Sequence, residues 1–300
     1  MADVTPASWQ GVPALRLRVG PTEAVVLPTV GMTVVSLTQG GVEHVAVPGG
    51  VRQLRQGHTS GVPLLAPWAN RLDRYQFEVA GRAVDVATPR TRTDDRGLPI
   101  HGLLVGSDGW TVLRRAAHGS TAAIRAVREI TSEEFAFPHR IEVELQLRPR
   151  RLQVATTVDA SLGSPAPVAL GWHPYLTLPS SRPGWLLSLP EREHLALDDR
   201  GLPTGATHPQ PLEERPLGGR HFDDLYRVSD DARLALTSPL GPHVALELVE
   251  GYSYAQVWVP PHRRYAALEP MSVPTDALAR DEAPMIAAGQ RRTLVFALTV

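Results

Sequence analysis

The chain has 300 residues, of which 43% are hydrophobic, and a formal net charge of −1 at pH 7. This balance gives no general attraction to nucleic acids or anionic membranes, and no apolar stretch approaches the roughly 20 residues that span a bilayer. Cysteine and lysine are both absent, which excludes disulfides, thiolate metal sites, cysteine nucleophiles and lysine Schiff bases. Because Met1–Gln10 lacks the basic and apolar regions of a secretory signal, we expect a cytoplasmic protein.

In chain order, the first predicted elements are short strands joined by turns. Residues 75–79 and 83–86 alternate apolar and polar side chains on either side of Ala80-Gly81-Arg82, which predicts a hairpin. Residues 110–113 and 122–127 flank a second turn in the same way. This spacing is typical of antiparallel strands rather than of helices.

The clearest alternation lies near the middle of the chain. Residues 141–147 and 152–158 each place apolar side chains at every second position, and Arg148-Pro149-Arg150 predicts the turn between them. Further strands are predicted at 233–236, 244–249 and 293–298.

No segment carries the apolar spacing of an amphipathic helix over a dozen residues. The stretch 201–219, rich in proline and glycine, is predicted to be a long loop, and no linker divides the chain. We therefore predict an all-β fold in a single domain, 1–300, built from two large antiparallel sheets packed face to face.

Two short polar segments are ambiguous when each is taken alone. Arg71, in Pro67–Leu72, could pair with a surface carboxylate as easily as bind a ligand. His101, which stands between an apolar pair and Gly102, could equally be a hydrogen-bonded core residue.

Two further segments place a titratable group among apolar or aromatic residues. His173 stands between Trp172 and Tyr175, and aromatic side chains such as Trp172 can cover the apolar face of a sugar ring. Glu269 ends an apolar run, where a carboxylate is costly to bury unless it is paired or hydrogen-bonded. A packed aromatic cluster and a structural ion pair are the competing interpretations.

Taken together and in order, these segments resemble the aldose 1-epimerase (galactose mutarotase) family over most of the chain. Each motif is short, and the specificity lies in their joint order. The matching segments are Asn70-Arg71, the hairpin at 75–86, His101-Gly102 with Gly109-Trp110, Phe137-Pro138, His173-Pro174-Tyr175 and Glu269-Pro270.

The resemblance departs from the family pattern at two places. The aspartate that the family carries before an aromatic residue falls best on Asp223, with Asp224 one position away. Leu176 follows Tyr175 where the best-known members continue Phe-Asn-Leu, which indicates a divergent subgroup.

The resemblance implies a galactose mutarotase-like supersandwich and an isomerase that interconverts the α and β anomers of a hexose. It implies that His173 is the general acid and Glu269 the general base, as an imidazole and a carboxylate of different intrinsic pKa allow. It further implies that Asn70, Arg71, His101 and Asp223 bind the sugar, and we add Trp172 to this set. No metal or organic cofactor is needed for this reaction.

Several alternatives stay open at this point. A phosphorylated or sulfonated sugar would need an arginine cluster, for which Arg71, Arg74, Arg263 and Arg264 are candidates. A non-catalytic sugar-binding module on the same fold would not need the acid–base pair. Glycoside hydrolysis usually needs two carboxylates, of which only Glu269 is clearly placed. We expect a small-molecule sugar as the ligand and a monomer or homodimer, with no nucleic-acid or membrane partner.

Overall fold

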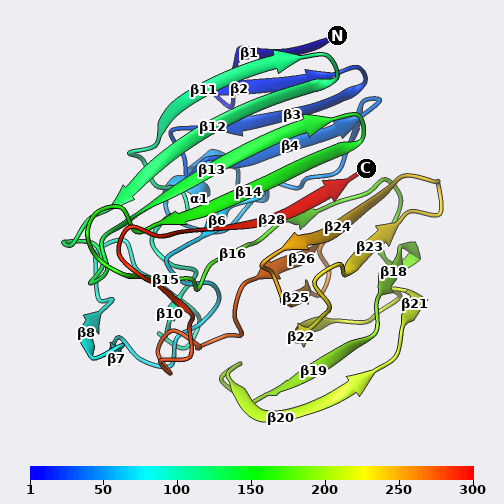
Figure 1. Ribbon diagram of the computed structural model, residues 1–300. Helices are drawn as coiled ribbons and strands as arrows, with labels where there is room; N and C mark the ends of the chain where they lie inside the picture. The colour runs from blue at the N-terminus through cyan, green and yellow to red at the C-terminus, as the bar shows by residue number, and fades with distance from the viewer.

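Strands with alternating burial build the largest sheet of the computed structural model, which describes residues 1–300 (Figure 1). Ile141, Val143, Leu145 and Leu147 are buried, and the residues between them are partly exposed, as the alternation predicts. In spatial order its nine antiparallel strands are β11 (Thr111–His118), β12 (Thr121–Ile130), β13 (His139–Arg148), β14 (Arg151–Asp159), β28 (Arg291–Thr299), β24 (His243–Glu250), β23 (Arg233–Thr237), β18 (Leu186–Leu189) and β21 (Glu213–Pro216). The hairpins and strands predicted for these segments are confirmed, and β28 pairs between β14 and β24.

A second sheet of five strands comes from the N-terminal part of the chain and lies behind the large sheet in Figure 1. Its strands, in order, are β1 (Ala2–Trp9), β2 (Val12–Val19), β3 (Thr22–Leu27), β4 (Thr33–Gln39) and β5 (Val42–Glu43). β1 and β2 pack against β11, β12 and β13. The sequence interpretation had not singled out these strands.

The third sheet carries Asp223 and Glu269, two of the site residues that the sequence predicted. Its strands, in order, are β20 (Pro203–Gln210), β19 (Arg192–Leu197), β22 (Phe222–Arg227), β25 (Tyr254–Val259), β26 (Ala266–Met271), β16 (Gly171–Trp172) and β6 (Leu64–Leu65), and β17 (Tyr175–Leu176) also pairs with β26. β26 contacts β24 of the large sheet. A cluster of 69 buried hydrophobic residues fills the space between the sheets, so the predicted all-β antiparallel sandwich is confirmed.

The predicted long loop at 201–219 is wrong in part. Residues 203–210 and 213–216 form β20 and β21, which lie at the edges of two different sheets. Most of their side chains are exposed, so no apolar alternation marks them as strands. Proline is tolerated in such edge strands because the edge leaves backbone groups unpaired.

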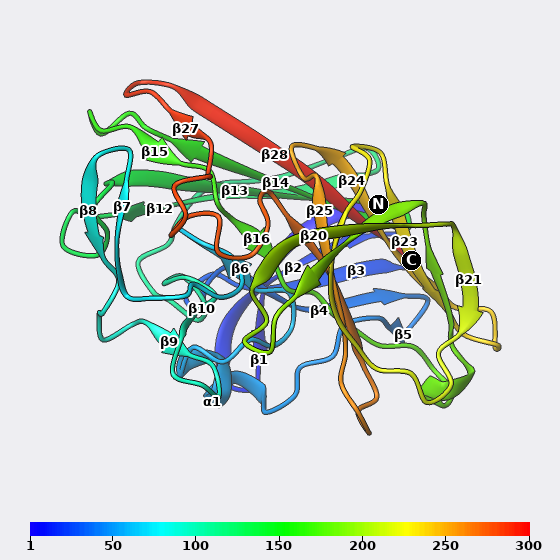
Figure 2. The same ribbon diagram turned by 90° about the horizontal axis from the view of Figure 1, so that it is seen from below.

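Short ribbons and helices complete the fold. The predicted hairpin at 75–86 is confirmed as β7 (Gln76–Val79) and β8 (Arg82–Asp85), which stand at one end of the molecule in Figure 2, opposite β21. The other small elements are β9 (Arg92–Thr93) with β10 (Pro99–Ile100), β15 (Ala166–Pro167) with β27 (Met285–Ile286), the helix α1 (Gly50–Arg55) and the 3-10 turn η1 (Arg182–Gly184). None of the helical segments is long and apolar enough to cross a membrane.

Candidate active site

Glu269 lies in the interior of the third sheet, on strand β26. All six residues of β26 are buried, and Glu269 itself is only 2% exposed. It pairs in register with Gln256 on β25. Because β26 has strands on both sides, the sheet holds this carboxylate in a fixed position.

His173 faces Glu269 from the short connection between β16 and β17. Its Nε2 lies 3.3 Å from Oε1 of Glu269, and the imidazole is 5% exposed. The ring of Tyr175 stacks on the His173 ring with centroids 4.5 Å apart, and the Tyr175 hydroxyl hydrogen-bonds to Thr59 at 2.7 Å. The structure therefore brings together the two groups that the sequence had paired, and an aromatic neighbour fixes the imidazole plane.

Burial shifts the proton affinities of these groups in opposite directions. It raises the pKa of Glu269 well above its usual range, and the nearby charge of Asp223 adds to the rise. Burial also lowers the pKa of His173 to about 3. Both directions favour a neutral pair that shares a single proton, which suits groups that exchange the roles of acid and base.

Arg71 projects into the same cavity and is held by several oxygens. Its Nε donates to Asp94 at 3.0 Å, and its Nη2 lies 3.7 Å from Asp223. Asn70 is buried and has a φ of 56°. Its Oδ1 accepts a hydrogen bond from the backbone N–H of Arg71 at 3.0 Å. These contacts restrict the guanidinium and leave it directed at the cavity.

His101 enters beside His173 because of a close approach between two backbones. Its ring lies edge-on to that of His173 with centroids 5.5 Å apart. Gly102 has φ of 70°, and a Cβ there would lie 2.3 Å from the carbonyl oxygen of Ala66, so only glycine fits. Burial, with the neighbouring His173 and Arg71, keeps the pKa of His101 well below its usual range. His101 is therefore a neutral imidazole able to donate or accept a hydrogen bond.

Asp223 and its neighbour Asp224 point to opposite sides of strand β22. Asp223 lines the cavity and accepts a hydrogen bond from Nε2 of Gln256 at 2.7 Å. Asp224 instead lies 3.2 Å from Nε2 of His194. A second carboxylate thus shares the cavity with Glu269, but the amide of Gln256 and the guanidinium of Arg71 already bind it.

The cavity enclosed by these groups has a volume of about 150 Å³ and opens into a wider cleft of about 800 Å³. The cleft is walled by the segments around Asp94 and Asp198. The residues that line the inner cavity are Thr59, Asn70, Arg71, Ile100, His101, His173, Tyr175, Asp223, Gln256, Trp258 and Glu269. No group of three or more His, Asp or Glu side chains is arranged to hold a metal ion.

Trp172 is not part of this cavity, and its placement among the sugar-binding residues was wrong. It precedes His173 directly, so its side chain projects to the opposite face of β16. There it is fully buried against Phe296 of β28, and its Nε1 donates to Thr156 at 3.0 Å. Trp172 therefore joins two sheets.

Sequence reasoning also missed residues that line the cavity. Gln256 and Trp258 lie on β25, which reads as an apolar strand, and Thr59 comes from a loop with no recognised motif. The Oε1 of Gln256 is buried without a hydrogen-bond partner. The sequence did contain one signal for Gln256. It is a lone amide within an apolar strand, and a buried polar group needs a hydrogen-bond partner.

The sequence profile described as aldose 1-epimerase matches residues 13–299. The chain belongs to the aldose 1-epimerase family. The resemblance read from the ordered motifs is thereby confirmed, and the match covers nearly the whole chain. No curated protein sequence matches this family member significantly.

Solved structures share the aldose 1-epimerase fold at low sequence identity. A galactose mutarotase-like protein from Clostridium acetobutylicum has a TM-score of 0.88 and 20% identity, covering 99% of this chain and 98% of that one. A galactose mutarotase-like protein from Lactobacillus casei has a TM-score of 0.74 and 16% identity, covering 95% and 99%. Galactose 1-epimerase from Lactobacillus acidophilus has a TM-score of 0.77 and 10% identity, covering 100% and 98%. These similarities establish the shared fold.

Proposed function

We propose that this chain is a mutarotase that interconverts the α and β anomers of an aldose. The observation that carries the proposal is the contact of 3.3 Å between two buried groups, His173 and Glu269, at the floor of a polar cavity. A binding module would gain nothing from burying a titratable pair, which costs free energy unless the pair does chemistry or is fully hydrogen-bonded. Family membership supports the same reaction.

In the proposed reaction, the single proton of the pair first moves from Glu269 to His173 across the contact of 3.3 Å. Glu269 then removes the proton of the anomeric hydroxyl while His173 gives its proton to the ring oxygen. The electron pair of the O–H bond forms the carbonyl, and the bond between the anomeric carbon and the ring oxygen breaks. Rotation of the aldehyde and closure on its other face return both protons, so the roles of the two residues reverse. No atom or charge is gained or lost overall.

The remaining polar groups would hold the sugar during this cycle. Arg71 and His101 offer hydrogen-bond donors to hydroxyls and to the open-chain carbonyl, and Asp223 and Gln256 offer acceptors. Trp258 offers an apolar surface to the ring face. Because these groups are already fixed by their neighbours, little ordering is required when the sugar binds.

Polarimetry of freshly dissolved α-glucose and α-galactose tests the proposal. We expect the wild type to accelerate the approach to the anomeric equilibrium, and Glu269→Gln or His173→Asn to lower kcat by about 10²- to 10⁴-fold. Asp224→Asn is the matched control, because it removes a nearby carboxylate that faces away from the cavity. Binding of a sugar without any acceleration by the wild type would instead identify a non-catalytic binding module.

A further inference from the structure

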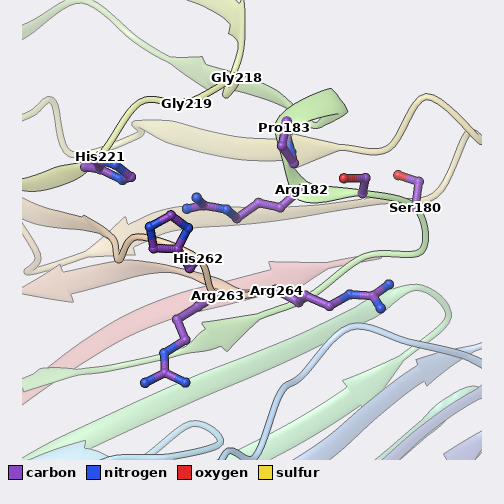
Figure 3. A pocket seen from close by; sticks show the side chains of 10 residues that line it. Ser180, Arg182, Pro183, Gly218, Gly219, His221, His262, Arg263 and Arg264 are labelled. Atoms are coloured by element: carbon purple, nitrogen blue, oxygen red, sulfur yellow. The ribbon is translucent and has the colours of Figure 1, made fainter.

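A second cavity lies at the turn between β25 and β26, outside the acid–base pocket (Figure 3). Its volume is about 660 Å³. Three of its lining residues are arginines and two are histidines, and none is acidic: Ser180, Ser181, Arg182, Pro183, Gly218, Gly219, His221, His262, Arg263 and Arg264. Such a lining would attract an anionic ligand.

Backbone hydrogen bonds tie the walls of this cavity together. The N–H of Gly218 donates to the carbonyl of Pro183 at 2.8 Å and so joins two of the three loops. Nη1 of Arg182 donates to the carbonyl of Pro260 at 2.9 Å and so joins the third. The cavity is therefore preformed, and a ligand would not need to order it.

Arg182 is the strongest sign of a ligand. Its residue exposure is only 6%, and no carboxylate neutralises it. Burial alone lowers the pKa of this guanidinium. A buried cation is costly unless its charge is paired, and the carbonyl of Pro260, which accepts a hydrogen bond from Nη1, carries no negative charge.

The side chains converge from separate loops. In Figure 3 the guanidinium of Arg182 reaches across the cavity toward the rings of His221 and His262, whereas Arg263 and Arg264 diverge at the rim. His221 precedes Asp223 of the acid–base cavity by two positions, which in extended chain is roughly 7 Å. The two cavities are therefore neighbours.

From this geometry we propose that the cavity of Arg182, His221 and His262 binds the phosphoryl group of a small molecule. The planar guanidinium can donate hydrogen bonds to two oxygens of a phosphate at once, and imidazole N–H groups can donate to a third oxygen. Gly218 and Gly219 add no side chain to the wall, so a ligand can approach the backbone there. Binding of a phosphoryl group in this cavity does not depend on the mutarotase proposal, and only its assignment to a sugar phosphate does.

The arginines that the sequence offered for a phosphate divide between separate places. Arg71 lines the acid–base cavity, and Arg74 donates to the carbonyl of Ala279. Only Arg263 and Arg264 line the second cavity, where they join Arg182, a residue the sequence had not singled out.

The phosphoryl group has two possible sources, which kinetics can separate. It could belong to a phosphorylated aldose whose ring enters the neighbouring acid–base cavity. It could instead belong to a separate phosphorylated ligand. In the first case, loss of Arg182 raises KM for glucose 6-phosphate but not for glucose. In the second, phosphate binding is lost while both KM values stay unchanged.

Isothermal titration of the 300-residue protein with inorganic phosphate and with glucose 6-phosphate tests the site. We expect saturable binding at one site, weakened by about tenfold or more in Arg182→Gln. Because Arg182 also supports Pro260, His262→Asn provides a second test, and asparagine tolerates the left-handed backbone at this position, where φ is 58°. Arg18→Gln, in the exposed pair with Asp3 on the five-stranded sheet, is the charge-matched control.

Saturable binding that both cavity variants weaken and Arg18→Gln preserves would support the site, whichever source the kinetics identify. Absence of saturable binding by the wild type with either probe would overturn it. Equal affinity in the wild type, Arg182→Gln and His262→Asn would overturn it as well. Because binding is measured without turnover, these results are independent of whether the protein accelerates mutarotation.

Discussion

His173 and Glu269 illustrate how the surroundings of a residue set its chemistry. Neither side chain is unusual by itself, yet burial raises the pKa of Glu269 and lowers the pKa of His173, so that the usual order of their proton affinities is reversed. The pair then behaves as one titrating unit with a single proton to move between two positions. Asp223 and Arg71 act on this unit with opposite signs, since one raises and the other lowers the pKa of Glu269.

This coupling predicts the pH dependence of kcat/KM. A second proton enters the pair only in acid, because the pKa of His173 is lowered to about 3, and it removes the base. The last proton leaves only well above the usual pKa of a glutamate, and its loss removes the acid. We therefore expect kcat/KM from polarimetry to stay level as the pH falls through 6.5, after subtraction of the spontaneous rate. A half-loss of activity close to pH 6.5 would show an ordinary solvated imidazole instead.

At the same scale, the sequence identified most of the cavity but not the direction of every side chain. The predicted residues that line the cavity are Asn70, Arg71, His101, His173, Asp223 and Glu269. The sequence could identify them because each belongs to a motif in the order typical of the family. Trp172 could not be assigned to a face, since β16 has only two residues and offers no alternation to read. Gln256 carried no motif at all.

Among the elements, the contact between Gly102 and Ala66 is the one that places His101. The loop after β10 and the segment after β6 meet here with no room for a side chain, since a Cβ would lie 2.3 Å from a carbonyl oxygen. Displacement of this loop would move the imidazole of His101 out of the cavity.

Gly102→Ala should therefore be costly in both stability and activity. We expect a loss of more than about 1 kcal/mol in the free energy of unfolding, measured with urea, together with reduced kcat/KM. Gly81→Ala is the matched control, because its φ of 73° is nearly the same but its Cβ would meet nothing within 4 Å. If both variants lost the same stability, backbone strain alone would account for the effect and the close approach would be unimportant.

Strand prediction succeeded where one face of a strand is buried and the other is not. β13 and β14 show this pattern in nearly every residue, so the alternation predicted both strands to within two residues of their ends. β20 and β21 are exposed on most positions, and pairing at a sheet edge, rather than burial, makes them strands. Such tertiary pairing has no local signal in the sequence.

For the molecule as a whole, the packing of the sheets depends on large side chains between them. Trp172 of the third sheet packs on Phe296 of the large sheet, with ring centroids 5.8 Å apart. The same strand segment carries His173 on its other face. A residue that joins two sheets and the residue proposed as the general acid are therefore adjacent in the chain.

Trp172→Phe tests this separation. The variant loses the hydrogen bond to Thr156 and some packing volume, so we expect a loss of about 1–3 kcal/mol in unfolding free energy and no change in KM. Trp258→Phe is the comparison, because Trp258 lines the cavity and its substitution should raise KM. If Trp172→Phe raised KM and left the stability unchanged, the result would indicate that Trp172 contacts the sugar.

The position of β28 between β14 and β24 has a consequence for biosynthesis. The strand that joins the two halves of the largest sheet is the last of all the strands to leave the ribosome. Until residues 291–299 emerge, β14 and β24 present open edges that could pair with other chains. Because contacts of such long sequence separation form slowly, these two edges stay open until β28 pairs with both of them.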